Sequence, residues 1–186
     1  MKTLKNKSAR IVPGSNGRLI EFPPTIRTLK FGNYKESHGP VYQTTLSLAL
    51  PYVVFRITGD HYVGMRMGFC NKPVERDGRI TTRKLQFPLL PSVEIEENYK
   101  VCMNGYIFSR NNMSNLDIVG LFWQMPFNMY GSMTHHRWPA TTLLADTPLR
   151  SYKHWAELTK KHGSPDFMLD FDYIYKNIAG RFQCRF

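Results

Sequence analysis

The chain has 186 residues, of which 42% are apolar and 13% aromatic, which is enough for the core of one domain and too much for a disordered protein. It has no run of 18 apolar residues and no apolar stretch after its basic start, so we expect neither a membrane helix nor a signal peptide. Its 25 lysines and arginines against 14 acidic residues give a net charge of +11, which favours acidic partners such as nucleic acid, a nucleoprotein assembly or an acidic protein surface.

Residues 1–17 are predicted to form a basic N-terminal arm that ends in a turn rich in proline and glycine. We expect this arm to be the part of the chain that binds nucleic acid or another polyanion. A single α+β domain is then expected over residues 18–186. The other basic clusters are a loop at residues 76–84 and the pair Arg181 and Arg185 near the end.

The first half of the domain has the alternating apolar pattern of β-strands. We expect strands at 18–22, 25–31, 41–50 and 52–57, a return strand at 61–70, and an extended segment at 80–87. Thr58-Gly59-Asp60 is a typical hairpin turn between two of them. The pattern therefore predicts an antiparallel β-meander over residues 41–104.

The second half changes to helical spacing near Ser114. Ser114, with Asp117 at the third helical position, predicts a capped helix that runs to Pro126. A second helix is expected from Thr147-Pro148 to about His162, and a third from Ser164-Pro165 to Gly180. Strands first and helices afterwards indicate the α+β class.

The sequence lacks the motifs of several common metal, nucleotide and catalytic sites. The cysteines have no CxxC spacing and no histidine pair completes a metal site, so we expect no metal, no cofactor and no disulfide framework, as in a reducing cytoplasm. Phosphate-binding loops and the GxSxG elbow are absent from the sequence as well. Asp166, Asp170 and Asp172 are the acidic residues of a helix start rather than a nuclease site.

Cys102 is the best candidate for a nucleophile. Pro88 and Pro91 are expected to keep the approach to it extended, and a short strand then ends at this cysteine just before Gly105. A reactive thiolate needs a base and an oxyanion donor, for which His135, with its neighbour His136, and Asn104 are the candidates. The alternative is that Cys102 is a small core residue, as lone cysteines in apolar runs often are.

The order of these motifs resembles a known family. Val101-Cys102-Met103-Asn104-Gly105, a helix with Phe122-Trp123, and then Gly131-Ser132-Met133-Thr134-His135 resemble the prokaryotic ubiquitin-conjugating-enzyme-like (UBC-like) proteins, including protein B of the PRTRC mobile-element systems. The resemblance covers about residues 41–138 and leaves a helical extension after it.

The resemblance implies a UBC-like fold and a thioester on Cys102, formed with a ubiquitin-like protein that an adenylating enzyme supplies, with His135 as the downstream histidine. Where eukaryotic members have His-Pro-Asn, this chain has Leu90-Pro91-Ser92, so the usual oxyanion asparagine is replaced. The second hypothesis is a non-enzymatic basic protein of a phage or mobile element, which binds nucleic acid or packs in a nucleoprotein or virion assembly.

Overall fold

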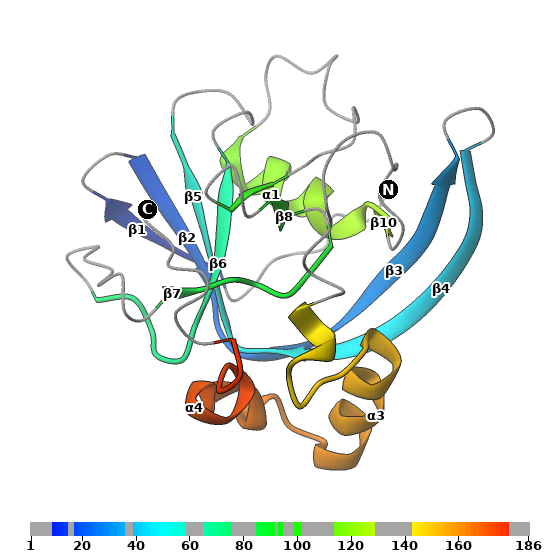
Figure 1. The fold of residues 1–186 in the computed structure, drawn as a ribbon. Coiled ribbons are helices and arrows are strands. Elements are labelled where there is room, and N and C mark those ends of the chain that lie inside the picture. The colour runs from blue at the N-terminus through cyan, green and yellow to red at the C-terminus, as the bar shows by residue number, and fades with distance from the viewer. Residues whose placement is uncertain are drawn as a thin grey trace.

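The computed structural model contains two β-sheets with helices between and beside them (Figure 1). It describes residues 9–14, 17–35, 39–58, 65–75, 85–91, 93–94, 99–101, 114–128 and 143–178. The fold is α+β, with antiparallel strands in the first half and most helix in the second, as the change of hydrophobic period predicts.

The larger sheet has seven strands, all in antiparallel pairs. Its path is β1-β2-β5-β6-β9-β8, and β7 also pairs with β6. The strands are β1 (Arg10–Gly14), β2 (Gly17–Phe22), β5 (Tyr52–Ile57), β6 (Arg66–Cys70), β7 (Leu85–Gln86), β8 (Val93–Glu94) and β9 (Lys100–Val101).

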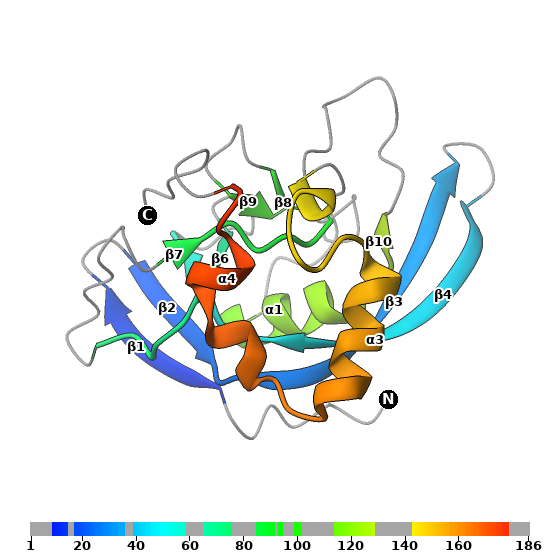
Figure 2. The ribbon, with the colours of Figure 1, turned by 60° about the horizontal axis from the view of Figure 1, so that its bottom comes forward.

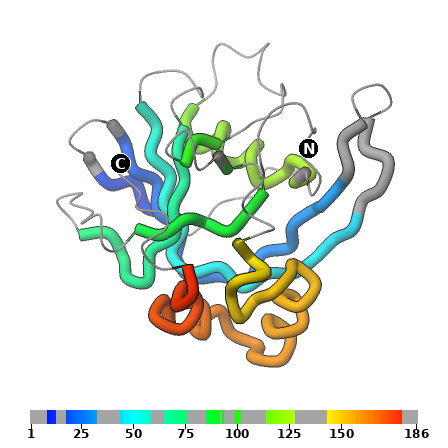
Figure 3. The backbone as a smooth tube through the Cα atoms, in the orientation of Figure 1, coloured from blue at the N-terminus to red at the C-terminus, as the bar shows by residue number. Residues whose placement is uncertain are grey.

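The smaller sheet is built on a long curved hairpin of β3 (Thr25–Lys35) and β4 (Gly39–Leu50), with β10 (Phe127–Asn128) parallel to β3. The chain leaves the larger sheet after β2, forms this hairpin, and returns to the larger sheet in β5 (Figure 3). Consecutive strands β4 and β5 are therefore not neighbours, and the strand order is more complex than the simple meander expected over residues 41–104.

Helix α1 (Asn115–Gln124) lies between the two sheets (Figures 1 and 2). It begins where predicted, because Ser114 and Asp117 form a complete capping box. Helix α3 (Tyr152–His162) starts at Ser151 rather than at Thr147-Pro148. Arg150 has a left-handed φ of 56°, which an α-helix cannot contain, so the residues before it form a turn.

The predicted third helix is two short pieces. A 3-10 turn, η2 (Asp166–Leu169), is followed by α4 (Phe171–Ile174). Asp170 separates them, with a non-helical ψ of 77° and a side chain that accepts a hydrogen bond from the Tyr173 N–H. Such local bonds from aspartate to the backbone compete with a continuous helix.

The end of the predicted basic arm belongs to the larger sheet. Arg10–Gly14 forms β1, with Arg10 directly opposite Glu21 on β2. The Arg10 guanidinium pairs with the buried Glu21 carboxylate at 2.9 Å and also donates to the Val74 carbonyl, while Glu21 accepts from the Val74 N–H. Arg10 is therefore engaged by an internal acid rather than available in an arm, and the domain begins before residue 18.

Aromatic rings join the two sheets, between which the described strands make no pairing. The buried Phe122 on α1 contacts one ring of each sheet. The distance between ring centroids is 5.5 Å to Phe55 of the larger sheet and 5.2 Å to Phe127 of the smaller sheet. Phe127 continues to Phe31, and Phe31 to Tyr152 on α3. One buried chain of rings thus runs from the larger sheet through α1 to the C-terminal helices.

Helix α3 closes part of the outer edge of β4. The Ala49 N–H donates to Thr159 Oγ1 at 2.9 Å, and Trp155 Nε1 donates to the Ala49 carbonyl at 3.0 Å. Two side chains of a helix therefore satisfy the groups that a further strand would otherwise pair with. The helix ends at Gly163, whose φ of 67° is the left-handed cap that glycine adopts without strain.

Gly68 is predicted to be intolerant of a side chain. A Cβ at this position would lie 2.6 Å from Cγ of the buried Leu85. Gly68→Ala should therefore lower the free energy of unfolding by about 1–3 kcal/mol, the usual cost of overpacking. Urea denaturation measures this change in the free energy of unfolding.

Gly120→Ala on α1 is the matched control, because a Cβ there meets nothing within 4 Å and alanine favours a helix. An equal loss of stability in both variants would contradict the predicted crowding at Gly68.

Arg10→Gln should destabilise the domain by about 1–3 kcal/mol, because it leaves the Glu21 carboxylate buried without its cation. Thermal and urea unfolding test this, with Arg18→Gln as an exposed control on the neighbouring strand that removes the same charge. If both variants unfold alike, the contact between Arg10 and Glu21 contributes nothing.

Candidate functional site

The segment that leads toward Cys102 is buried along most of its described length. Phe87, Leu89 and Leu90 have at most 1% of their surface exposed, and the two prolines beside them are buried. The segment is not uniformly extended as the prolines predict, because Leu89 has a left-handed φ of 49°. A leucine in this region is rare, so surrounding contacts must hold it there.

Two tyrosines from the C-terminal part of the chain provide such contacts. Tyr152 on α3 donates its phenolic hydrogen to the Leu89 carbonyl at 3.1 Å, and Tyr175, just after α4, donates to the Phe87 carbonyl at 2.6 Å. Both hydrogen bonds are buried. The predicted helical extension is therefore bonded directly to the segment that precedes the candidate nucleophile.

Burial also sets the protonation of these tyrosines. Desolvation raises the pKa of Tyr152 far above its usual value, because a phenolate would lose its hydration in this site. The pKa of Tyr175 is raised as well, by burial first and then by the nearby Tyr99 and Cys70. Both phenols therefore stay neutral and keep the hydrogen that they donate.

Strand β9 brings the chain to the residue before Cys102. The Val101 N–H donates to the Met65 carbonyl at 2.9 Å, and the Met67 N–H donates to the Tyr99 carbonyl at 3.0 Å. Val101 also faces Val93 of β8, and Tyr99 enters the strand with a left-handed φ of 64°. The chain is thus held by backbone hydrogen bonds and apolar packing up to Val101.

The three candidate site residues, Cys102, Asn104 and His135, lie outside the described residues, and so does His136. Their roles and their proximity remain predictions. Cys70 is described, and it is a buried core residue at the end of β6 with 2% of its surface exposed. A buried thiol in apolar surroundings is expected to react slowly, so Cys70 is not a rival candidate for the nucleophile.

Two histidines and two aspartates of the C-terminal part make structural contacts. His154 contacts Glu157 on the surface of α3, and His162 stacks on Phe167 at 4.6 Å. Asp170 caps α4, and Asp166 accepts a hydrogen bond from Ser164. Within the ranges that the structure describes, no group of three metal-binding side chains comes together.

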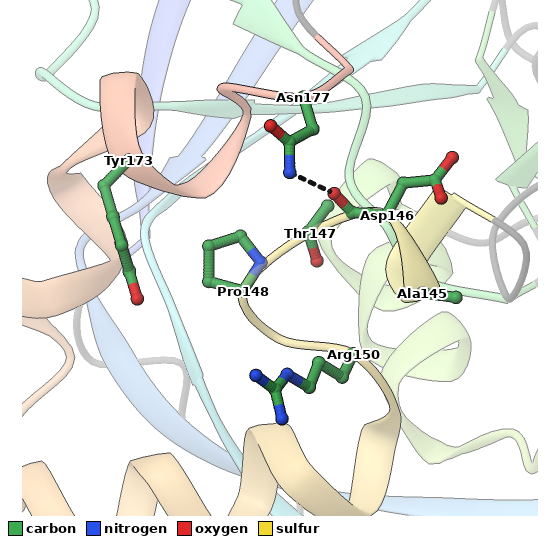
Figure 4. A pocket seen from close by; sticks show the side chains of 7 residues that line it. All are labelled: Ala145, Asp146, Thr147, Pro148, Arg150, Tyr173 and Asn177. Carbon is green, nitrogen blue, oxygen red and sulfur yellow. Dashed lines mark hydrogen bonds between the residues drawn. The ribbon is translucent and has the colours of Figure 1, made fainter.

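An open pocket of about 720 Å³ lies between the turn before α3 and the residues that follow η2 (Figure 4). It is lined by Ala145, Asp146, Thr147, Pro148, Arg150, Tyr173 and Asn177. Asn177 closes one side by donating to the Asp146 carbonyl at 3.1 Å. The Arg150 guanidinium and the exposed Tyr173 ring give the pocket one cation and one aromatic surface.

Sequence patterns did not indicate the two anchoring tyrosines or the pocket. Tyr175 follows an apolar helical pattern, and Tyr152 opens another, so each ring is explained by core packing alone. The hydroxyl of Tyr152 bonds to a residue that is 63 positions away in the sequence, and that of Tyr175 to one that is 88 positions away. Local spacing of residues does not encode such distant contacts. The one available signal is that a buried tyrosine usually finds a hydrogen-bond acceptor.

Tyr175→Phe should lower the free energy of unfolding by about 1–3 kcal/mol, because the Phe87 carbonyl stays buried without a donor. It should also reduce the loss of stability at alkaline pH. The pKa of Tyr175 is raised in the folded protein, so only the unfolded chain releases this proton above about pH 10, and stability falls as pH rises further.

The measurement is urea unfolding at neutral pH and at a series of alkaline pH values. Tyr173→Phe is the matched control, because Tyr173 is 57% exposed and close in sequence. An alkaline slope that Tyr175→Phe leaves unchanged would show that this phenol is not protected by burial.

Comparison with known proteins identifies no relative: no family model, no curated protein and no solved structure matches the chain. Among the described helices, none is long and apolar enough to cross a membrane. The UBC-like resemblance therefore rests on the order of short motifs in this sequence, and the functional residues it implies are argued as proposals.

Proposed function

We propose that this protein is UBC-like and carries a ubiquitin-like protein as a thioester on Cys102. The strongest observation in favour of the proposal is that the chain just before this cysteine is held firmly in place. Buried packing, two tyrosine hydrogen bonds and the pairing of β9 with β6 and β8 hold residues 87–91 and 99–101 in one arrangement. A reactive group works best when rigid elements position it.

The left-handed residues add to this argument. Leu89 and Tyr99 both have positive φ angles, and each belongs to the segment that leads to Cys102. Residues in such conformations cost free energy and cluster at functional sites. A segment that only filled the core would gain nothing from two of them, so their presence here favours a functional role for the residues that follow.

The proposed chemistry is an exchange of thioesters. The Cys102 thiolate attacks the C-terminal carbonyl carbon of the ubiquitin-like protein, which is held as a thioester on a cysteine of the adenylating enzyme. One C–S bond forms, the other breaks, and the enzyme's cysteine leaves as a thiolate. Asn104 would donate to the oxyanion and His135 would accept the proton of the thiol. In the later step an amine of the final acceptor attacks the same carbonyl carbon; a C–N bond forms, the C–S bond to Cys102 breaks, and the proton lost by the amine leaves Cys102 as a thiol.

The first test is genetic context, because an adenylating enzyme or a ubiquitin-like protein encoded beside this gene would supply the partners. The chain is then incubated with those proteins and ATP, and its intact mass is measured. We expect an adduct of the mass of the ubiquitin-like protein that thiol reducing agents remove. Cys102→Ala should abolish it, and Cys102→Ser should give none or a slower oxyester that thiols do not cleave.

Cys184→Ala is the control, since it removes a thiol that is not among the proposed site residues. Limited alkylation with iodoacetamide followed by mass mapping provides a second readout, in which Cys102 should label before Cys70. No adduct together with slow labelling of Cys102 would make this cysteine a core residue and would favour the non-enzymatic basic protein.

A further inference from the structure

The pocket between the turn before α3 and the residues that follow η2 has the size of a small-molecule site. Its volume of about 720 Å³ falls in the range of about 300–1,000 Å³ that is usual for ligand pockets. One wall is the turn at residues 145–150, and the other consists of Tyr173 on α4 and Asn177 just after it (Figure 4). A ligand that fills the pocket would therefore contact two separate segments of the chain.

Arg150 provides the one cation among the residues that line the pocket. It is exposed and forms no ion pair with any other described residue. Its left-handed φ of 56° is costly for a residue with a side chain, and in this conformation its guanidinium points into the pocket (Figure 4). The N–H donors of a guanidinium match two oxygens of a carboxylate or phosphate, so this wall is suited to one anionic group.

Asp146 is the acidic residue of the pocket lining, and it does not neutralise Arg150. No ion pair joins the two side chains, and Asp146 has another interaction of its own. Figure 4 shows its carboxylate directed away from the Arg150 guanidinium. The positive charge of Arg150 is therefore available to a ligand.

Tyr173 provides a flat apolar surface on the opposite wall (Figure 4). Its side chain is 57% exposed, whereas its neighbours Ile174 and Tyr175 are buried, so the ring is not part of the core. An exposed aromatic ring of this kind stacks well on flat heterocycles and bases. The second part of the ligand is therefore expected to be a planar ring.

Asn177 can recognise the edge of such a ring. One amide hydrogen is used on the Asp146 carbonyl, which leaves the second hydrogen and Oδ1 of the same amide. Figure 4 shows Oδ1 turned away from Asp146, toward the side of the pocket on which Tyr173 lies. An asparagine amide that offers one donor and one acceptor together matches the amino group and the adjacent ring nitrogen of adenine.

We propose that this pocket binds a nucleoside monophosphate with an adenine base. The phosphate pairs with Arg150, the base stacks on Tyr173, and the amino edge of the base bonds to Asn177. One cation matches one phosphate group. A longer phosphate chain would bring further negative charge toward Asp146 without a second cation in the lining to pair with it.

Isothermal titration calorimetry of the full chain with adenosine monophosphate tests the proposal. Adenosine lacks the phosphate and inorganic phosphate lacks the base, so each should bind at least about tenfold more weakly. Arg150→Gln and Tyr173→Ala should each weaken binding of the monophosphate by about tenfold or more. Tyr173→Phe keeps the ring, and should change the affinity by less than about twofold.

Lys153→Gln is the matched control, because Lys153 is exposed on α3, lies outside the pocket lining and carries the same charge as Arg150. Thermal unfolding without ligand checks that each variant keeps its fold. Equal weakening by Arg150→Gln and Lys153→Gln would reduce the effect to net charge and overturn the site. Cys102→Ala should leave the affinity unchanged, so the result is separate from that of the thioester test.

The unaltered protein gives three further outcomes that would contradict the proposal. The first is no binding of adenosine monophosphate at millimolar concentration. The second is equal binding of inorganic phosphate, which would leave only an unspecific contact with an anion. The third is equal or tighter binding of N-acetylphenylalanine, which would assign the pocket to the carboxyl end of a peptide instead.

Discussion

The packing of the two sheets against each other depends on Phe122, which lies between them. Among the described residues no strand of one sheet pairs with a strand of the other, so side-chain packing has a large part in holding the sheets together. Phe122 contacts a ring from each sheet and is completely buried, and its neighbour Trp123 contacts the same two rings, Phe55 and Phe127. Aromatic rings suit this position because they bury large areas in well-defined edge-to-face contacts. The capping box at Ser114 sets where α1 begins, and therefore which residues reach this point.

The same packing explains why the C-terminal helices are part of the domain. Ring contacts lead from Phe127 through Phe31 to Tyr152, whose hydroxyl then holds the Leu89 carbonyl. Tyr175 makes the equivalent bond to Phe87. Residues 85–91 thus receive packing from one side and hydrogen bonds from another. The region that resembles the UBC-like family is expected to end near residue 138, yet its described part is stabilised by residues well beyond that boundary.

Much of the fold follows from local patterns. The strand at residues 52–57 and the helix capped by Ser114 have strong local signals, and both form where expected. The errors occur where a distant contact or a single backbone angle decides. Arg10 joins a strand because Glu21 and Val74 bind it, and the second helix starts late because Arg150 is left-handed. The candidate site could be predicted only as a motif, and the tyrosines that hold Phe87 and Leu89 before it come from far away in the sequence.

The contact between α3 and Ala49 has a consequence for how this protein unfolds and aggregates. From Thr44 to Leu50 the edge strand β4 has no charged residue, proline or glycine, the features that usually prevent strands from adding to one another. Trp155 and Thr159 occupy its open hydrogen-bonding groups at one end. If α3 detaches, this uncharged edge becomes a template for another chain, so early unfolding of the C-terminal helices leads toward aggregation rather than toward a soluble intermediate.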